Sequence, residues 1–213
     1  MMTRNKIAPF NAYHRRYEAW FQHHEAAYHS ELLAVRALLS CQGLGLEIGV
    51  GTGRFAAPLG ISVGLDPSRA MLAYAVERGI TGIQGIAEAL PFKDAVFDCG
   101  LVVATICFVT DPKTMLKEAY RVLKSGASLV IGFVDRNSRL GQQYLAHQDE
   151  SVFYRGARFY SAPEVERLLL ERGFVDPAWG QTLTKPLNEI QEIEPLCDGH
   201  GEGGFVVVQA LKS

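Results

Sequence analysis

Short apolar runs alternate with segments of helical periodicity along most of the 213-residue chain. Apolar runs bounded by turn residues predict strands, and apolar residues recurring every three or four positions predict helices. We expect strands at 44–50, 62–65, 82–84, 97–103 and 128–134, within 175–184, and at 205–211. We expect helices at 12–40, 54–59, 67–78, 111–124 and 162–172.

This alternation predicts the architecture. Repeated β-α-β units with almost wholly apolar strands form a doubly wound α/β sheet whose strands are mostly parallel. No helix is expected between 184 and 205, so the last strand should run antiparallel to its neighbour. The pattern therefore predicts an α/β fold with a doubly wound seven-stranded sheet, mostly parallel with an antiparallel last strand.

Several helix ends carry their own signals. Pro67 suits the first turn of the helix at 67–78. Ser161 and Glu164 have the spacing of a capping box before the helix at 162–172, and Gly173 is a typical stop residue. These signals fix the expected ends of both helices from local chemistry alone.

Composition narrows the classes of function. The length suits one domain over 1–213, and a net charge of −2 with a pI of about 6.3 gives no basic field for nucleic acid. No apolar run approaches the ~20 residues of a membrane span, and no secretory signal core follows the first residues. Cys99 and Cys107 lie in or beside apolar runs, where cysteine packs as a small hydrophobe. We therefore expect a reduced, cytoplasmic protein.

The strongest candidate for a binding site is the segment 47–53, here called the glycine loop. Glu47 directly follows the apolar run 44–46, and Gly49, Gly51 and Gly53 come after it at every second position. Glycine allows positive φ and close approach of the backbone to a ligand, and a carboxylate at the strand tip can hold an ammonium group. A dinucleotide fingerprint needs a further glycine at position 54, where this chain has Arg54. The alternative is a tight strand-to-helix turn without a ligand.

Asp66 stands at the end of the next expected strand. An acid at this place in an α/β sheet can accept hydrogen bonds from both ribose hydroxyls of a nucleoside ligand. The same device serves S-adenosylmethionine (SAM) and NAD, so it does not separate them. The alternative role is an N-cap for the helix that follows.

Three segments together resemble the class I SAM-dependent methyltransferases, of the small-molecule type similar to the ubiquinone and menaquinone methyltransferases. They are the glycine loop, the segment 85–92 (GIAEALPF) and the segment 118–126 (EAYRVLKSG). The resemblance covers 44–134 by motif and 161–211 by architecture only. The chain departs from the family pattern at Ile86, where Asp is frequent, at Ser125, where Pro is usual, and at 106–108, where a His is common.

The resemblance implies a Rossmann-like methyltransferase fold, SAM as cofactor and S-adenosyl-L-homocysteine as its product. It also implies the residues that bind the cofactor. Tyr17 would belong to a segment that covers the cofactor in many relatives, and Ile86 would replace a polar adenine contact by an apolar one. The implied cofactor-binding residues are Glu47, Gly49, Gly51, Gly53, Asp66, Pro67, Ile86, Ala87, Glu88, Ala104 and Tyr17.

Two long connections should hold the methyl acceptor. Both 135–160 and 185–204 leave the carboxyl edge of the sheet, where ligands of such sheets lie, and loops of this length are usually functional. The helical segment 12–40, with its aromatic stripe, could close over the same edge as a lid, although such a stripe is more often core. The candidate substrate residues are Tyr144, Tyr154, Arg158, Tyr160 and Glu202.

The sequence thus predicts a SAM-dependent methyltransferase that acts on a small-molecule acceptor, without a nucleic-acid or membrane partner. It leaves open the acceptor, the methylated atom, the general base and the oligomeric state. The pair His200 and Glu202 is weak evidence for a metal, so none is expected. Two alternatives remain, a SAM-binding protein without catalysis and an NAD-dependent oxidoreductase.

Overall fold

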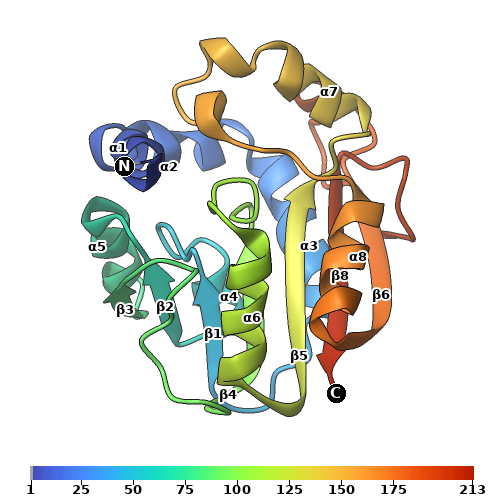
Figure 1. Ribbon diagram of the computed structural model, residues 1–213. Coiled ribbons are helices and arrows are strands. Elements are labelled where there is room, and N and C mark those ends of the chain that lie inside the picture. Colours follow the sequence, from blue (N-terminus) through green and yellow to red (C-terminus); the bar gives the residue numbers. More distant parts are fainter. Residues whose placement is uncertain (1) are drawn as a thin grey trace.

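The computed structural model describes residues 2–213 and contains one sheet in the order β3-β2-β1-β4-β5-β8-β6-β7 (Figure 1). The strands β3, β2, β1, β4 and β5 run parallel, and β8 runs antiparallel to both of its neighbours, β5 and β6. The strands are β1 (Gly45–Ile48), β2 (Val63–Asp66), β3 (Thr81–Gln84), β4 (Phe97–Val103), β5 (Leu123–Val134), β6 (Phe174–Thr182), β7 (Cys197–Asp198) and β8 (Phe205–Lys212).

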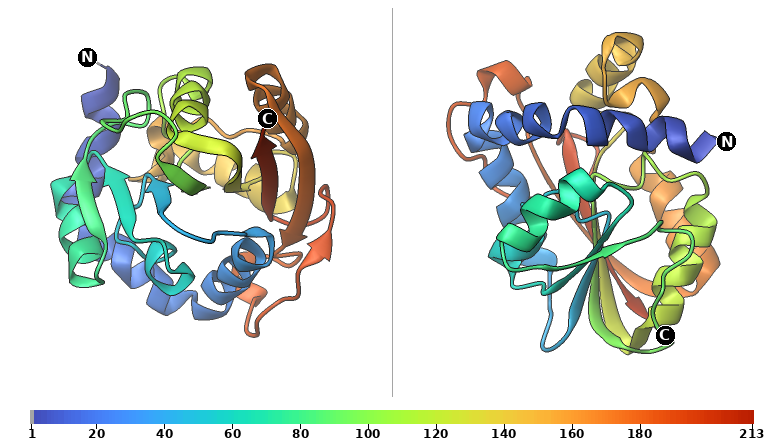
Figure 2. Two further views of the ribbon diagram at one scale, coloured as in Figure 1. Left: turned by 90° about the horizontal axis from the view of Figure 1, so that it is seen from below. Right: turned by 90° about the vertical axis from the view of Figure 1, so that its left-hand side faces the viewer.

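Helices cover both faces of the sheet and the edge at which the parallel strands end (Figures 1 and 2). The α-helices are α1 (Met2–Ala12), α2 (His14–His23), α3 (Glu25–Leu38), α4 (Ala56–Leu59), α5 (Arg69–Glu77), α6 (Pro112–Val122), α7 (Arg139–Ala146) and α8 (Ala162–Arg172). Three short 3-10 helices are η1 (Gln148–Glu150), η2 (Tyr154–Gly156) and η3 (Leu187–Glu189).

Two apolar cores lie on opposite faces of the sheet. Helices α6 and α8 pack on one face, and α3, α4 and α5 pack on the other. Along β5, Leu129 and Ile131 point into the first core and Val130 into the second, as the alternation of a buried strand requires. The remaining helices α1, α2 and α7 lie across the carboxyl ends of the parallel strands (Figure 1), so that edge is the covered one.

The expected α/β class is confirmed, with differences in detail. The short strand β7 pairs with β6 and makes eight strands rather than seven. The expected helix at 12–40 is two helices, because His24, with φ −123° and ψ 46°, interrupts it. A further helix, α1, precedes them. The capping box of Ser161 and Glu164 is present, and Gly173 ends α8 at φ +104°.

The cysteines correct one expectation. Cys41 and Cys99 form a disulfide that links the segment after α3 to β4, so Cys99 is not a free small hydrophobe. Cys107 is buried, and its burial raises the pKa of the thiol to about 12. The argument from free cysteines for a reducing compartment therefore no longer holds. Among residues 2–213, no helix is long and apolar enough to cross a membrane.

Candidate active site

The glycine loop leaves β1 and turns over the end of β2. The N–H of Gly49 donates to the carbonyl of Leu65 at 2.7 Å, and Gly51 has φ +51°, which glycine adopts without strain. A Cβ on Gly51 would lie 3.5 Å from Met71 Cε and 3.7 Å from Tyr17 Oη, on the wall of a large cavity. The missing side chain keeps the backbone open to a ligand there.

The other two glycines of the loop have packing reasons. A Cβ on Gly49 would collide with the side chain of Thr105, and a Cβ on Gly53 would lie 3.1 Å from the Cα of Ala75 in α5. Gly49 lines the cavity, whereas Gly53 does not. Gly53 therefore sets the close approach of the loop to α5.

Asp66 connects the end of β2 to the loop. Its Oδ2 accepts the N–H of Gly51 at 3.0 Å, and its Oδ1 accepts the N–H of Ser68 at 2.8 Å. Burial raises the pKa of Asp66 to about 6, although both backbone hydrogen bonds oppose this. Ser68 is the N-cap of α5 and accepts the N–H of Met71, so the alternative role of Asp66 as that cap is wrong. Asp66 and Pro67 both line the cavity.

Glu47 lies beneath the loop and not on the cavity wall. Its side chain is 1% exposed, and its Oε2 has no hydrogen-bond partner among the described residues. Burial raises the pKa of Glu47 well above its usual range, which the hydrogen bond from the Ala56 backbone opposes only in part. Because Glu47 does not line the cavity, its unpartnered oxygen would reach the α-ammonium group of SAM through a bridging water.

The segment after β3 and the end of β4 complete this half of the cavity. Ile86, Ala87 and Ala104 line it, and Ala104 adopts φ +49° at the strand end. Glu88 also lines it and accepts the N–H groups of Thr110, at 2.6 Å, and Asp111. The family resemblance thus assigned to cofactor binding two residues that do not reach the cavity, Glu47 and Gly53.

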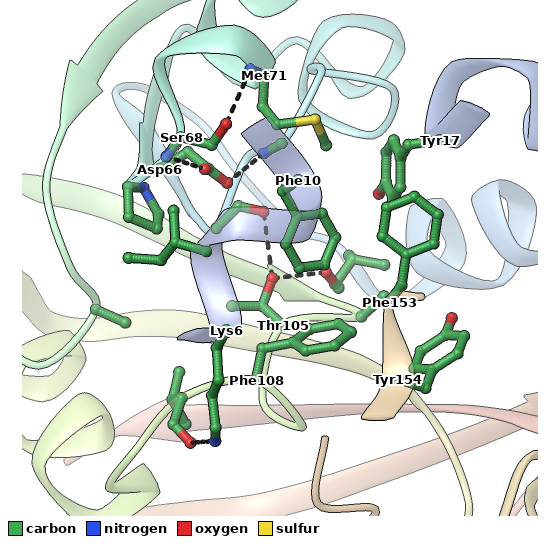
Figure 3. A pocket seen from close by; sticks show the side chains of 18 of the residues that line it. Lys6, Phe10, Tyr17, Asp66, Ser68, Met71, Thr105, Phe108, Phe153 and Tyr154 are labelled. Carbon is green, nitrogen blue, oxygen red and sulfur yellow. Dashed lines mark hydrogen bonds between the residues drawn. The ribbon is translucent and has the colours of Figure 1, made fainter. Parts of the chain in front are cut away.

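The cavity has a volume of about 440 Å³, within the usual range for small-molecule sites. Its second half is aromatic. Tyr144 stacks on Tyr154 with ring centroids 5.1 Å apart, and Tyr154 stacks on Phe108 at 5.7 Å. Figure 3 shows Phe10, Tyr17 and Phe153 gathered beside Phe108 and Tyr154. We call these six residues the aromatic cluster: Phe10, Tyr17, Phe108, Tyr144, Phe153 and Tyr154.

An ion-pair network holds α2 over the glycine loop. Glu18 Oε2 lies 2.7 Å from a guanidinium nitrogen of both Arg54 and Arg78, and its side chain is 12% exposed. Partial burial would raise the pKa of Glu18, but the hydrogen bonds from the two arginines outweigh it and lower the pKa. Arg54, in place of a fourth loop glycine, thus serves to attach the helix that carries Tyr17.

The structure brings only part of the predicted acceptor site together. Tyr144 and Tyr154 line the cavity, but Arg158, Tyr160 and Glu202 do not. The exposed Arg158 lies over the Tyr160 ring at 5.0 Å, and Tyr160 itself is buried beside the main cavity. Glu202 is exposed, and its N–H donates to Gln181 beyond the cavity. Between 185 and 204, only Leu187 reaches the wall.

Sequence reasoning missed several lining residues. Phe10 belongs to α1, a weakly amphipathic helix with Pro9 inside it, which gives little periodic signal. Glu31 of α3 is 9% exposed and lines the cavity, and burial raises its pKa to about 8. A glutamate on a helix is usually solvated, so its position in the sequence gave no sign of this role. Phe153 lies in the aromatic segment 135–160, which the sequence predicts to reach the site, although the candidate residues do not include it.

Comparison with known proteins shows which family has both this fold and this kind of site. A family model described as a methyltransferase domain matches residues 46–131. The crystal structure of a SAM-dependent methyltransferase from Thermotoga maritima, described as a possible histamine N-methyltransferase, is 48% identical. It covers 98% of this chain and 100% of that chain, with a TM-score of 0.95. The chain belongs to the SAM-dependent methyltransferases.

Two further proteins are similar to this chain over most of its length. An uncharacterised protein of Methanocaldococcus jannaschii is 43% identical over 203 residues, which cover 95% of this chain and 98% of that protein. The ubiquinone/menaquinone biosynthesis C-methyltransferase of Serratia proteamaculans is 28% identical over 190 residues, which cover 80% of this methyltransferase and 71% of that one. The predicted enzyme class and SAM cofactor are therefore confirmed, and the NAD-dependent oxidoreductase is not supported.

Proposed function

We propose that this methyltransferase transfers the methyl group of SAM to a small-molecule acceptor that binds against the aromatic cluster. One observation carries the proposal: a single cavity is lined by Gly51 and Asp66 on one side and by the aromatic cluster on the other. A cofactor along the glycine loop and an acceptor in the aromatic half would share one enclosed space. Such an arrangement aligns the reacting atoms, and alignment supplies much of the catalysis in this chemistry.

The residues have distinct roles in this proposal. Bound SAM supplies an electrophilic methyl carbon on a sulfonium. Asp66 holds the ribose hydroxyls with the lone pairs that its two backbone hydrogen bonds leave free. Glu47 lies behind the cavity wall, so its unpartnered oxygen reaches the α-ammonium through a bridging water. The apolar Ile86 and Ala87 border the adenine. The aromatic cluster excludes water from the acceptor half.

Fewer residues are proposed to contact the acceptor than the sequence predicts. Tyr144 and Tyr154 remain proposed acceptor contacts, whereas no contact with the cavity supports Arg158, Tyr160 or Glu202. The description of the Thermotoga relative names an amine, and that of the Serratia relative a carbon acceptor. Both classes belong in a screen. The single-domain organisation over 1–213, the lid at 12–40 and the cytoplasmic location stay predictions.

Calorimetry with S-adenosylhomocysteine and NAD, followed by transfer of labelled methyl from SAM to a panel of amines, phenols, thiols and carbon acids, tests the proposal. We expect micromolar or tighter binding of S-adenosylhomocysteine, negligible binding of NAD, and transfer to at least one acceptor class. Binding without transfer to any class would favour the non-catalytic alternative. Tighter binding of NAD would contradict the proposed placement of the cofactor.

A further inference from the structure

Three carboxylates line the cavity in the described part of the chain, and only one of them has no partner. Asp66 accepts two backbone N–H groups, and so does Glu88. Glu31 accepts no hydrogen bond from any described residue, although only 9% of its surface is exposed. A buried carboxylate without a partner in the protein is costly, so its place in a cavity wall makes it a candidate partner for a polar group of the ligand.

The position of Glu31 in the fold indicates that its partner belongs to the methyl acceptor and not to the cofactor. Helix α3 packs against β5, β6 and β8, whereas Asp66 ends β2. In the sheet, β1 and β4 lie between β2 and β5. Glu31 therefore faces the cavity from the half of the sheet that lies away from the expected ribose site. The cavity residues of that half are Val134, Tyr144, Leu187 and Phe205.

The surroundings of Glu31 favour a cation. Tyr17, Tyr144 and Tyr154 line the same cavity, and none of their hydroxyl groups forms a hydrogen bond among the described residues. Their rings offer π-faces that attract a cation, and their hydroxyls can serve as further hydrogen-bond partners. An anionic acceptor would instead be favoured by a cationic group that is both buried and unpartnered. Of the two cationic side chains at the wall, Lys6 donates to the Val109 carbonyl at 3.2 Å and Arg16 is exposed.

We infer that the methyl acceptor is an amine that binds as its ammonium ion, held by the Glu31 carboxylate and the surrounding phenols. Where the same nitrogen is methylated, it first loses a proton to solvent, and its lone pair then forms the N–C bond as the S–CH3 bond of SAM breaks. This inference rests on the proposed function, because it concerns the acceptor half of the same cavity. It assigns a role to a residue that neither the family motifs nor the glycine loop includes. The rest of the amine should be apolar or aromatic, since the other walls of this half are.

Binding of the amine is then linked to proton release. Burial raises the pKa of Glu31 to about 8, so the free protein holds this carboxyl neutral at pH 7. The titratable groups that face it across the cavity are the three phenols, whose pKa values burial also raises, so they stay neutral. The other titratable or charged groups that line the cavity are His147, Arg16, Lys6, Asp66 and Glu88. An ammonium lowers the pKa of Glu31, and the displaced proton leaves to solvent.

Calorimetry on the protein loaded with S-adenosylhomocysteine tests this. The probes are 2-phenylethylamine, tryptamine and cyclohexylamine, each paired with the alcohol of the same carbon frame. The variant is Glu31→Gln, which keeps the shape and removes the charge, with Glu31→Ala as a second variant. Glu25→Gln is the matched control, because Glu25 lies on the same helix but is exposed. Melting temperatures establish that each variant is folded.

At pH 8, we expect the wild type to bind at least one amine about tenfold more tightly than its alcohol, as hydrogen bonds to charged groups allow. Glu31→Gln should lose this preference and keep its affinity for the alcohol and for S-adenosylhomocysteine, and Glu25→Gln should behave as wild type. At pH 7, heats measured in phosphate and Tris buffers should reveal up to one proton released per amine by the wild type and none by Glu31→Gln.

Three outcomes would overturn the inference. The first is that no probe amine binds the wild type better than its alcohol. The second is that Glu31→Gln retains the preference. The third is that Glu31→Gln weakens S-adenosylhomocysteine and leaves amine binding alone, which would place Glu31 at the cofactor. Each is distinct from failure of the proposed function, in which the wild type would bind no S-adenosylhomocysteine or methylate no acceptor.

Discussion

The N–H of Gly51 donates a hydrogen bond to Oδ2 of Asp66 at 3.0 Å, across the gap between the glycine loop and the end of β2. This bond fixes the most open point of the loop relative to the carboxylate that is proposed to hold the ribose. Its other oxygen accepts the N–H of Ser68 and thereby fixes the start of α5. One buried side chain thus organises both walls of the cofactor half.

Asp66→Asn should therefore weaken S-adenosylhomocysteine and destabilise the fold together. The amide keeps one acceptor oxygen, loses the charge and places an NH₂ group against a backbone N–H. We expect a loss of about 1.5–3 kcal/mol in binding, or about 10- to 150-fold, as measured by calorimetry. Asp98→Asn is the control, because Asp98 also accepts a backbone N–H, from Leu44, but lies outside the cavity. Equal affinities for the two variants would contradict the ribose role.

Local signals in the sequence were sufficient to predict the bounds of the elements whose ends depend on nearby residues. The strand at 97–103 and the helix at 162–172 have the predicted bounds, because an uninterrupted apolar run defines one and a capping box with a glycine stop defines the other. The two-residue strand β7 exists only through its pairing with β6. The break at His24 and the helix α1 likewise carry no signal of composition or periodicity.

The same distinction between local signals and tertiary packing explains which site residues could be predicted from the sequence. Gly51 and Asp66 could be predicted because their spacing from strand ends carries the chemistry. Glu31 could not, since only the packing of α3 on the far half of the sheet turns this side chain into the cavity. Glu202 was assigned from the chemistry of its side chain and the length of its loop. The loop turns away from the cavity, and the backbone N–H of Glu202 bonds to Gln181 instead.

Gly51→Ala should impair cofactor binding more than it impairs folding. The added Cβ makes only ordinary contacts at 3.5 Å or more with the protein, but it projects into the cavity. Gly60→Ala is a matched control, since Gly60 also has positive φ, +74°, and its Cβ would meet nothing within 4 Å. Both variants should lose roughly 1–2 kcal/mol of stability from left-handed alanine. Calorimetry should detect weaker S-adenosylhomocysteine binding, by at least about tenfold, for Gly51→Ala only.

Glu18→Gln should loosen the attachment of α2. Two charge-assisted contacts, to Arg54 and Arg78, become weak, so the free energy of unfolding should fall by about 2 kcal/mol at pH 7. Because the folded pKa of Glu18 is lowered from 4.5, this stabilisation is present above 4.5 and is lost as the pH falls through the folded value. The dissociation rate of S-adenosylhomocysteine should rise, while the exposed Glu77→Gln should change neither quantity.

Hydrogen exchange should locate the segments that close over the ligands. Binding of S-adenosylhomocysteine should raise protection in α1, α2 and 139–156, which supply the aromatic cluster apart from Phe108. The sequence predicts the same for all of 185–204, but Leu187 alone reaches the cavity, so we expect the rise near η3 and not at 195–204. Helix α8, which packs with α6 on one face of the sheet and does not line the cavity, serves as the internal reference. Protection confined to 47–88 would contradict a lid.

The pH dependence of stability gives an independent test of Glu31. In the unfolded chain this carboxyl ionises near its ordinary value of 4.5, whereas in the folded protein burial raises the pKa to about 8. Between these values only the unfolded state loses the proton, so burial of Glu31 reduces the wild-type free energy of unfolding as the pH rises from 4.5 to 8. The variant Glu31→Gln has no such loss.

The variant should therefore match the wild type near pH 4.5 and exceed its free energy of unfolding by about 2–4 kcal/mol at pH 8 and above. Denaturant unfolding of both proteins across this range measures the difference, and the exposed Glu25→Gln should give a curve that parallels the wild type. If Glu31→Gln also parallels the wild type, the carboxyl is already ionised in the free protein. Amine binding would then release no proton, and the affinity for the ammonium would not rise between pH 6 and 8.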